Sequence, residues 1–218
     1  MSFDPASYVF SMGYSESLFV LLLALFFLYE TRLPAPVAAG FAMLTRVSGL
    51  AIGASQAVML VIRRDARPIR LLTVIAVVAV FAGWWVFIWN LTGNMTGWFE
   101  GSASWTRSLG PASVLRALRQ EWLPAILWVS FVGLMYLGSF LLLRSRPEMA
   151  LFGVIAITMS VLGAPASSMP RHSMIAIPAF AALALKLGPR YSAVATVGFA
   201  VLQLVFVEFA FGSLRRPP

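Results

Sequence analysis

The chain has 218 residues, of which 60% are hydrophobic and only 11% are charged, with a formal net charge of +8. Soluble domains carry about 25% charged residues, so this composition excludes an ordinary soluble domain and indicates a polytopic membrane protein. The absence of cysteine excludes disulfides and thiol nucleophiles, and the placement of the positive charges in short segments between apolar runs excludes nucleic acid as a partner.

Apolar runs follow one another along the chain at 18–29, 37–62, 71–91, 123–143, 149–163, 173–187 and 191–211. Three of them, at 71–91, 123–143 and 191–211, have the ~20 residues that a membrane-spanning helix needs. The runs at 149–163 and 173–187 are shorter, so we expect them to tilt little or to end in a protein-lined cavity. The sequence predicts an all-α, polytopic transmembrane helix bundle of about seven or eight membrane segments, some short or broken, forming a single domain over residues 1–218.

The run at 37–62 allows two interpretations. It is either one long tilted helix, or two half-length helices that dip into the membrane and return, with a break at residues 45–49. Arg46 at the centre of an unbroken helix would cost about 2.5–3.5 kcal/mol on insertion scales. We therefore favour the broken form, which brings Arg46 near water.

The charges of the short connecting segments predict the orientation. Arg63, Arg64, Arg67 and Arg70 crowd one segment, which is typical of the cytoplasmic side. Alternation then leaves 92–122 and 164–172 as outer loops. With a broken 37–62 segment, residues 14–17 also fall outside, while Glu30 and Arg32 fall inside; an unbroken segment would place Glu16 inside.

In the favoured form, polar patches converge on the outer face at residues 15–17, 45–46, 93–107 and 167–172. Such a mixture of carboxylates, guanidiniums and hydroxyls suits a sugar linked to phosphate, because Arg can clamp the phosphate bidentately. The candidate substrate-binding residues are Glu16, Arg46, Glu100, Trp105, Arg107 and Arg171.

Each candidate also has a structural interpretation. Glu16 can occupy the first turn of a helix capped by Ser15, and Arg46 can form a structural pair with Glu16. Trp105 can belong to an interfacial aromatic belt. Glu100 and Arg107 can be solvated loop charges, and Arg171 can be interfacial.

The patches resemble those of the PIG-V-like mannosyltransferases, membrane enzymes of the GT-C glycosyltransferase class. Residues 14–19 are similar to the family's Tyr-Ser-Glu-Ser-Leu-Phe segment, and residues 44–49 to its Leu-Thr-Arg-Pro-Thr-Gly stretch. Residues 93–107 follow its outer-loop pattern, which ends in Trp-Gly-Arg. Residues 169–172 with 177–180 resemble its Pro-Arg-Tyr sequence followed by a Phe-Pro-Leu-Phe helix. The departures include Asn94 for Asp, Ser102 for Gln, Thr106 for Gly and His172 for Tyr.

The resemblance implies a GT-C fold and an inverting transfer of mannose from a polyprenyl- or dolichyl-phosphate carrier to a lipid-linked or glycan acceptor on the non-cytoplasmic face. It implies no metal and no cofactor other than this lipid-phosphate-linked donor. The partners would be membrane lipids, the donor and the acceptor, in a bacterial plasma membrane or, in a eukaryote, the endoplasmic reticulum.

The family's catalytic Asp precedes the segment that matches residues 14–19, whereas the aspartates of this chain are Asp4 and Asp65. We therefore expect the chain to be the C-terminal portion of a longer enzyme, inactive alone, with the general base upstream of it. The alternative is a non-catalytic polytopic membrane protein, such as a transporter half or a partner subunit. An in-frame upstream sequence carrying an outer-loop Asp would distinguish the enzyme from this alternative.

Overall fold

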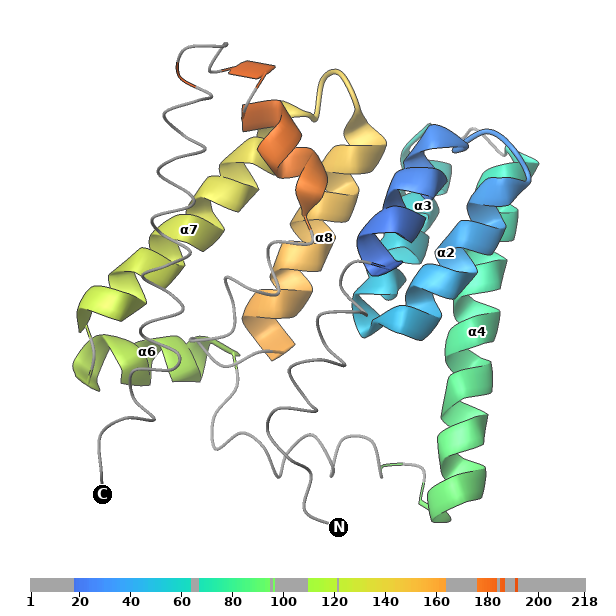
Figure 1. Cartoon of the computed structure of the whole chain (residues 1–218), viewed down its shortest axis with the longest axis horizontal. Coiled ribbons are helices and arrows are strands. Elements are labelled where there is room, and N and C mark those ends of the chain that lie inside the picture. Colours follow the sequence, from blue (N-terminus) through green and yellow to red (C-terminus); the bar gives the residue numbers. More distant parts are fainter. Residues whose placement is uncertain are drawn as a thin grey trace. The chain divides into compact units, whose positions relative to one another are not determined.

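The computed structural model describes residues 18–63, 67–94, 96, 110–120, 122–163, 176–183, 185–186 and 191 (Figure 1). Within these ranges every regular element is a helix, which confirms the all-α prediction. The chain divides into two compact units, Met1–Arg107 and Ser108–Pro218. Each is described below by itself.

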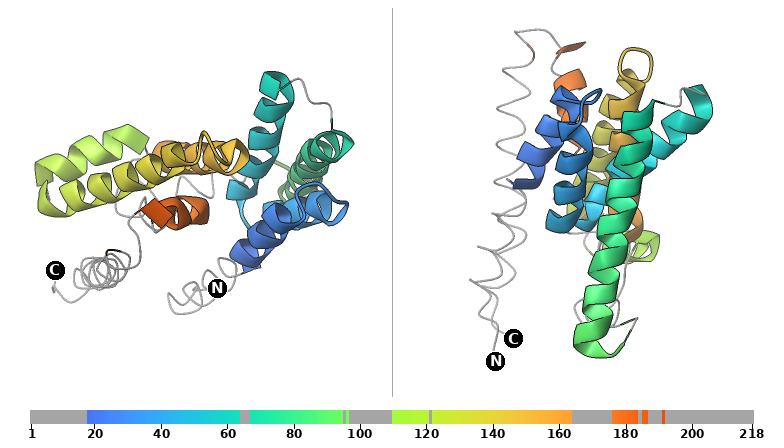
Figure 2. Two further views of the ribbon diagram at one scale, coloured as in Figure 1. Left: turned by 90° about the horizontal axis from the view of Figure 1, so that it is seen from above. Right: turned by 90° about the vertical axis from the view of Figure 1, so that its right-hand side faces the viewer.

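The first unit contains the helix Leu18–Leu28 and two helices, α2 and α3, that both pack against the long helix α4 (Figures 1 and 2). The bounds are Pro34–Thr45 for α2, Leu50–Arg63 for α3 and Pro68–Thr92 for α4, with a short 3-10 turn, η1, at Val47–Gly49. The run at 37–62 is thus broken between α2 and α3, as the sequence analysis favoured.

Proline and glycine mark the ends of these helices. Pro34 and Pro68 stand in the first turns of α2 and α4, where a missing N–H costs no helical hydrogen bond and the fixed φ favours the helix. Gly93 ends α4 at φ 67, a left-handed conformation that glycine adopts without a Cβ clash. Its N–H donates to the carbonyl of Trp89 at 2.8 Å. Local chemistry therefore accounts for the length of α4.

The interior of the first unit is made of small and apolar side chains. Gly53 of α3 lies directly against Val77 of α4, where an added Cβ would come within 2.9 Å of the Val77 side chain. Gly40 of α2 lies against Val80 in the same way, at 3.4 Å. These glycines let the helices approach closely, and apolar side chains fill the rest. The largest fully buried ones in this unit are Phe19, Leu23, Phe26, Ile52, Met59 and Val77.

Helix α4 is 25 residues long, and only 11% of its most apolar 18 residues are buried. Its buried residues, Arg70, Thr73 and Val77, all belong to its first half, while the second half exposes Trp84, Phe87 and other large apolar side chains. In the part of the chain that the structure describes, α4 is the one helix long and apolar enough to cross a membrane by length and composition. It corresponds to the predicted span at 71–91.

The other predicted runs coincide with shorter apolar helices or lie outside the described residues. The runs at 18–29 and 149–163 match Leu18–Leu28 and α8 (Pro147–Gly163), and the run at 123–143 matches α7 (Trp122–Leu141). Of the run at 173–187, residues 176–183 and 185–186 are described, whereas the run at 191–211 lies outside the described ranges except for Tyr191. Insertion of several segments into a membrane therefore stays a prediction.

In the second unit, helix α6 (Gly110–Gln120) lies within the range 92–122 that the sequence analysis treated as an outer loop. Ser113 of α6 is buried, and Val114 and Ala117 pack against Ala125 and Trp128 of α7. Gly110, at φ 62, starts α6 in contact with the backbone of α8. The segment is helical because its apolar residues recur at helical spacing and cover α7.

Helices α7 and α8 form the body of this unit together with residues 176–183. Their shared core consists of Phe131, Val132, Met135, Ile157, Ala176, Ala179 and Leu183. Two close approaches stabilise it: Gly153 of α8 faces the Ser139 side chain of α7, and Gly138 faces the Ala179 backbone. The Tyr136 and Thr158 hydroxyls are 2.9 Å apart and join α7 to α8 by a hydrogen bond.

Candidate functional site

Of the six predicted substrate-binding residues, the structure describes Arg46. It lies at the break between α2 and α3, in an extended conformation with φ −155 and ψ 141, and its side chain is half-buried. The other five lie outside the described residues: Glu16, Glu100, Trp105, Arg107 and Arg171. Their convergence with Arg46 in one cavity therefore stays a prediction.

Local hydrogen bonds hold the backbone around Arg46. The Arg46 N–H donates to the Ala42 carbonyl at 3.1 Å, and the Arg46 carbonyl accepts from the Gly49 N–H at 2.8 Å. The Thr45 hydroxyl adds a bond to the Ala42 carbonyl at 2.8 Å. A break inside an apolar segment leaves backbone groups that must be satisfied locally. The Arg46 N–H, the Arg46 carbonyl and the Ala42 carbonyl are among the groups at the break that form such local bonds.

Gly49 makes the tight return of the chain possible. A Cβ at this position would lie 2.5 Å from the Cα of Met43, so a larger residue would collide with the backbone of α2. The glycine therefore allows η1 and the start of α3 to lie directly against the end of α2. The geometry of the break thus explains Thr45 and Gly49 of this segment.

Arg46, just beyond the end of α2, lies at the opposite end of the α2–α3 pair from Arg63 and Arg67, and α4 continues past the level of the break (Figure 1). Helix α2 runs toward Arg46 and α3 runs back, so that the end of α3 and the start of α4 lie far from the break (Figure 1). At that far end the Glu30 and Arg70 side chains are 4.0 Å apart. The grouping of Glu30 with the basic segment is the arrangement that the broken form requires. Which end faces the cytoplasm remains a prediction.

The helix Leu18–Leu28 leads away from the Arg46 end and toward Glu30 (Figure 1). Its first residue, Leu18, is therefore at the end where the break lies. Glu16 precedes it by two residues and is outside the described ranges. Both interpretations of Glu16, as a helix-terminal charge and as a cavity residue, stay open.

Sequence reasoning missed a buried amide in α3. Gln56 is 1% exposed, and its side-chain oxygen and nitrogen have no hydrogen-bond partner. It lies one turn beyond Gly53, on the face of α3 that packs against α4. An isolated Gln inside an apolar run is itself a signal of a polar site, because such a residue is costly in an apolar environment.

Sequence reasoning also did not anticipate the contact between Glu30 and Arg70, although it assigned both to the same side. Arg70 is 3% exposed and Glu30 18% exposed. Burial of a guanidinium at this level requires a compensating charge. Arg70 is therefore part of the interior of the unit, unlike the exposed Arg63 and Arg67 nearby.

Comparison of the chain with family models, with curated proteins and with solved structures finds no match. The described residues define an all-helical protein with a broken helix pair, an arginine at the break and one long, exposed apolar helix.

Proposed function

We propose that the intact protein is a multi-pass membrane glycosyltransferase of the GT-C type, which transfers mannose from a polyprenyl- or dolichyl-phosphate carrier to a lipid-linked or glycan acceptor. The observation that carries the proposal is the helix break at Arg46. The segment that resembles the family's Leu-Thr-Arg-Pro-Thr-Gly stretch forms a tight turn. Arg46 lies in this turn with its backbone in an extended conformation.

The membrane setting is supported by α4. Large apolar side chains cover the second half of this helix, and burial there is slight. Exposed apolar surface of this extent is unfavourable in water and favourable in hydrocarbon. An exposed 25-residue helix of this kind is long enough to cross a bilayer core of about 30 Å.

Arg46 is proposed to bind the phosphate of the donor. In the reaction, a general base takes the proton of the acceptor hydroxyl, the hydroxyl oxygen bonds to the anomeric carbon, and the bond from that carbon to the carrier phosphate breaks. The phosphate oxygen departs with the bonding electron pair. A guanidinium stabilises the charge that develops on that oxygen, since its planar fork matches phosphate geometry.

The remaining roles follow the resemblance. Arg107 and Arg171 would assist Arg46 with the phosphate, Trp105 would stack on the sugar, and Glu16 and Glu100 would hold hydroxyl groups. The base would be the family's outer-loop Asp. The protein would reside in a bacterial plasma membrane or, in a eukaryote, in the endoplasmic reticulum membrane.

The test is a transfer assay with polyprenyl-phosphate-mannose and membranes that contain the protein, including any in-frame residues encoded before Met1. We expect Arg46→Ala to lower kcat by about 10²–10³, the usual effect of removing one charge-stabilising donor. Arg46→Lys should retain part of the rate, because it keeps the charge and loses the bidentate fork.

The matched control is Arg144→Ala, which removes an exposed arginine from the turn between α7 and α8. It should leave the rate unchanged. Undiminished turnover in Arg46→Ala would remove Arg46 from the mechanism. A folded wild-type protein that transfers no sugar from any lipid-phosphate donor would favour the alternative, a non-catalytic polytopic protein.

A further inference from the structure

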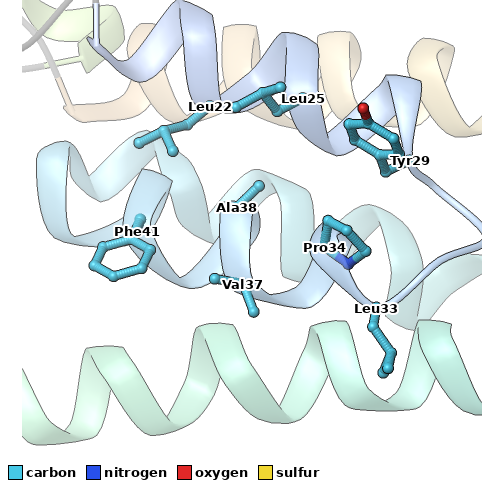
Figure 3. Close-up of a pocket in the computed structure, with 8 residues that line it drawn as sticks. All are labelled: Leu22, Leu25, Tyr29, Leu33, Pro34, Val37, Ala38 and Phe41. Atoms are coloured by element: carbon cyan, nitrogen blue, oxygen red, sulfur yellow. The ribbon is translucent and has the colours of Figure 1, made fainter.

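An open apolar groove of about 440 Å³ runs between the helix Leu18–Leu28 and α2 (Figure 3). Leu22, Leu25 and Tyr29 line one side, and Val37, Ala38 and Phe41 line the other, with the turn at residues 33–34 at one end. The Tyr29 hydroxyl is the only polar side-chain group among the residues that line it. The groove lies toward the Glu30 end of the unit and is separate from the break at Arg46.

A positive charge lies beside the Tyr29 end of this groove. Arg32 falls between the lining residues Tyr29 and Leu33 in the sequence, and its side chain is exposed. The neighbouring carboxylate, Glu30, faces Arg70 at 4.0 Å. An exposed guanidinium therefore stands next to the mouth of the groove.

We propose that the groove binds one acyl chain of an anionic glycerophospholipid, with the lipid phosphate at Arg32. From Leu33, the N-cap of α2, to Phe41 the chain rises by about 12 Å over eight residue steps, close to the ~15 Å depth of one leaflet's hydrocarbon. Tyr29 then lies at headgroup level, where amphipathic aromatic residues concentrate. The inference rests on the proposed membrane setting and is independent of sugar transfer.

The chemistry of the groove favours a lipid chain over a protein segment. Its walls are apolar apart from the Tyr29 hydroxyl. The backbone groups of an extended peptide would find hardly any hydrogen-bonding partner along these walls. A hydrocarbon chain needs none.

The experiment uses the full chain in phosphatidylcholine nanodiscs that contain a small fraction of a photo-crosslinkable lipid with a reactive group in mid-chain. The probe is either phosphatidylglycerol or phosphatidylcholine with the same acyl chains. Labelling is quantified, and the adduct is located by peptide mapping. We expect phosphatidylglycerol to label residues 22–41 about fivefold more than phosphatidylcholine, the contribution of one basic residue near an anionic lipid surface.

Two variants separate the charge from the groove. Arg32→Ala should reduce the preference for phosphatidylglycerol to near unity, whereas Arg144→Ala, at a turn of the other unit, should not change it. Val37→Trp should lower labelling by both lipids, because Val37 is 58% exposed in the groove and the larger ring occupies it. Val61→Trp, at an exposed position of α3 away from the groove, is the matched control.

Helical circular dichroism and a monodisperse elution profile establish that each variant is folded before labelling. Equal labelling by the two lipids in the wild type, or an unchanged preference in Arg32→Ala, would overturn the proposal. So would displacement of the probe by low concentrations of polyprenyl phosphate, since that result assigns the groove to the sugar carrier. A protein without transferase activity that still shows the Arg32-dependent preference would sustain the lipid site and reject only the enzyme.

Discussion

Removal of Glu30 should destabilise the first unit far more than removal of an ordinary surface charge. Its carboxylate is 4.0 Å from the guanidinium of Arg70, which is 3% exposed. At this separation two unit charges attract by about 4 kcal/mol at the effective dielectric constant of about 20 that suits partly buried pairs. Loss of one partner from a buried pair typically costs 3–5 kcal/mol, because the other charge stays buried. We expect Glu30→Gln to lower the free energy of unfolding by about 3 kcal/mol.

The complete thermodynamic cycle distinguishes this explanation from a general effect of mutation. Arg70→Met should cost less, about 1–2 kcal/mol, because Glu30 is 18% exposed and regains water more easily. The double variant should return to within about 1 kcal/mol of the wild type, since neither charge is left alone. A coupling energy of this kind is the signature of direct contact.

The assay is reversible unfolding in mixed micelles, followed by tryptophan fluorescence, for the wild type and the three variants. Arg144→Met, at the exposed turn between α7 and α8, is the control and should change stability by no more than about 0.5 kcal/mol. If Glu30→Gln costs under 1 kcal/mol, or if the two single effects simply add, the ion pair does not stabilise the unit and the reasoning is wrong.

Two further predictions concern Gln56, which is buried in α3, and Gly49, which packs η1 against α2. Gln56→Leu should stabilise the protein by about 1–3 kcal/mol in the same assay, because it removes a buried amide without partners; a loss of stability would show that the amide is satisfied. Gly49→Ala should destabilise by about 1–3 kcal/mol, since its Cβ would collide with the backbone of α2. Gly83→Ala, where nothing lies within 4 Å of the added Cβ, should be neutral or slightly stabilising, and equal effects at both glycines would contradict the close approach.

The all-helical architecture and the break at Arg46 could be predicted from the sequence, because both follow from local properties. Long apolar runs without strand-like alternation indicate helices, and the cost of an arginine in mid-run indicates an interruption. Helix α6 was not anticipated within 92–122. Its 11 residues mix arginines with apolar side chains, and the apolar face becomes evident only when α7 is there to cover it.

The candidate site could be predicted only in part, because it depends on contacts between segments distant in sequence. Arg46 lies at a break, as expected, but the cost argument does not show what its guanidinium binds. Gln56 also shows that contacts between distant segments are not visible in the sequence. Its position inside an apolar run was visible in the sequence, yet its burial without hydrogen-bond partners depends on how α3 packs against α4.

The first unit accommodates two arginines of apolar segments by different means, and the difference bears on function. Arg70 continues an unbroken helix, is almost fully buried and is compensated by Glu30 from another segment. Arg46 interrupts its helix, keeps its side chain half-exposed and forms backbone hydrogen bonds with Ala42 and Gly49. The first arrangement needs no special turn. The second requires a glycine in backbone contact with α2, and under the proposed function the Arg46 guanidinium at this break would bind the phosphate of the donor.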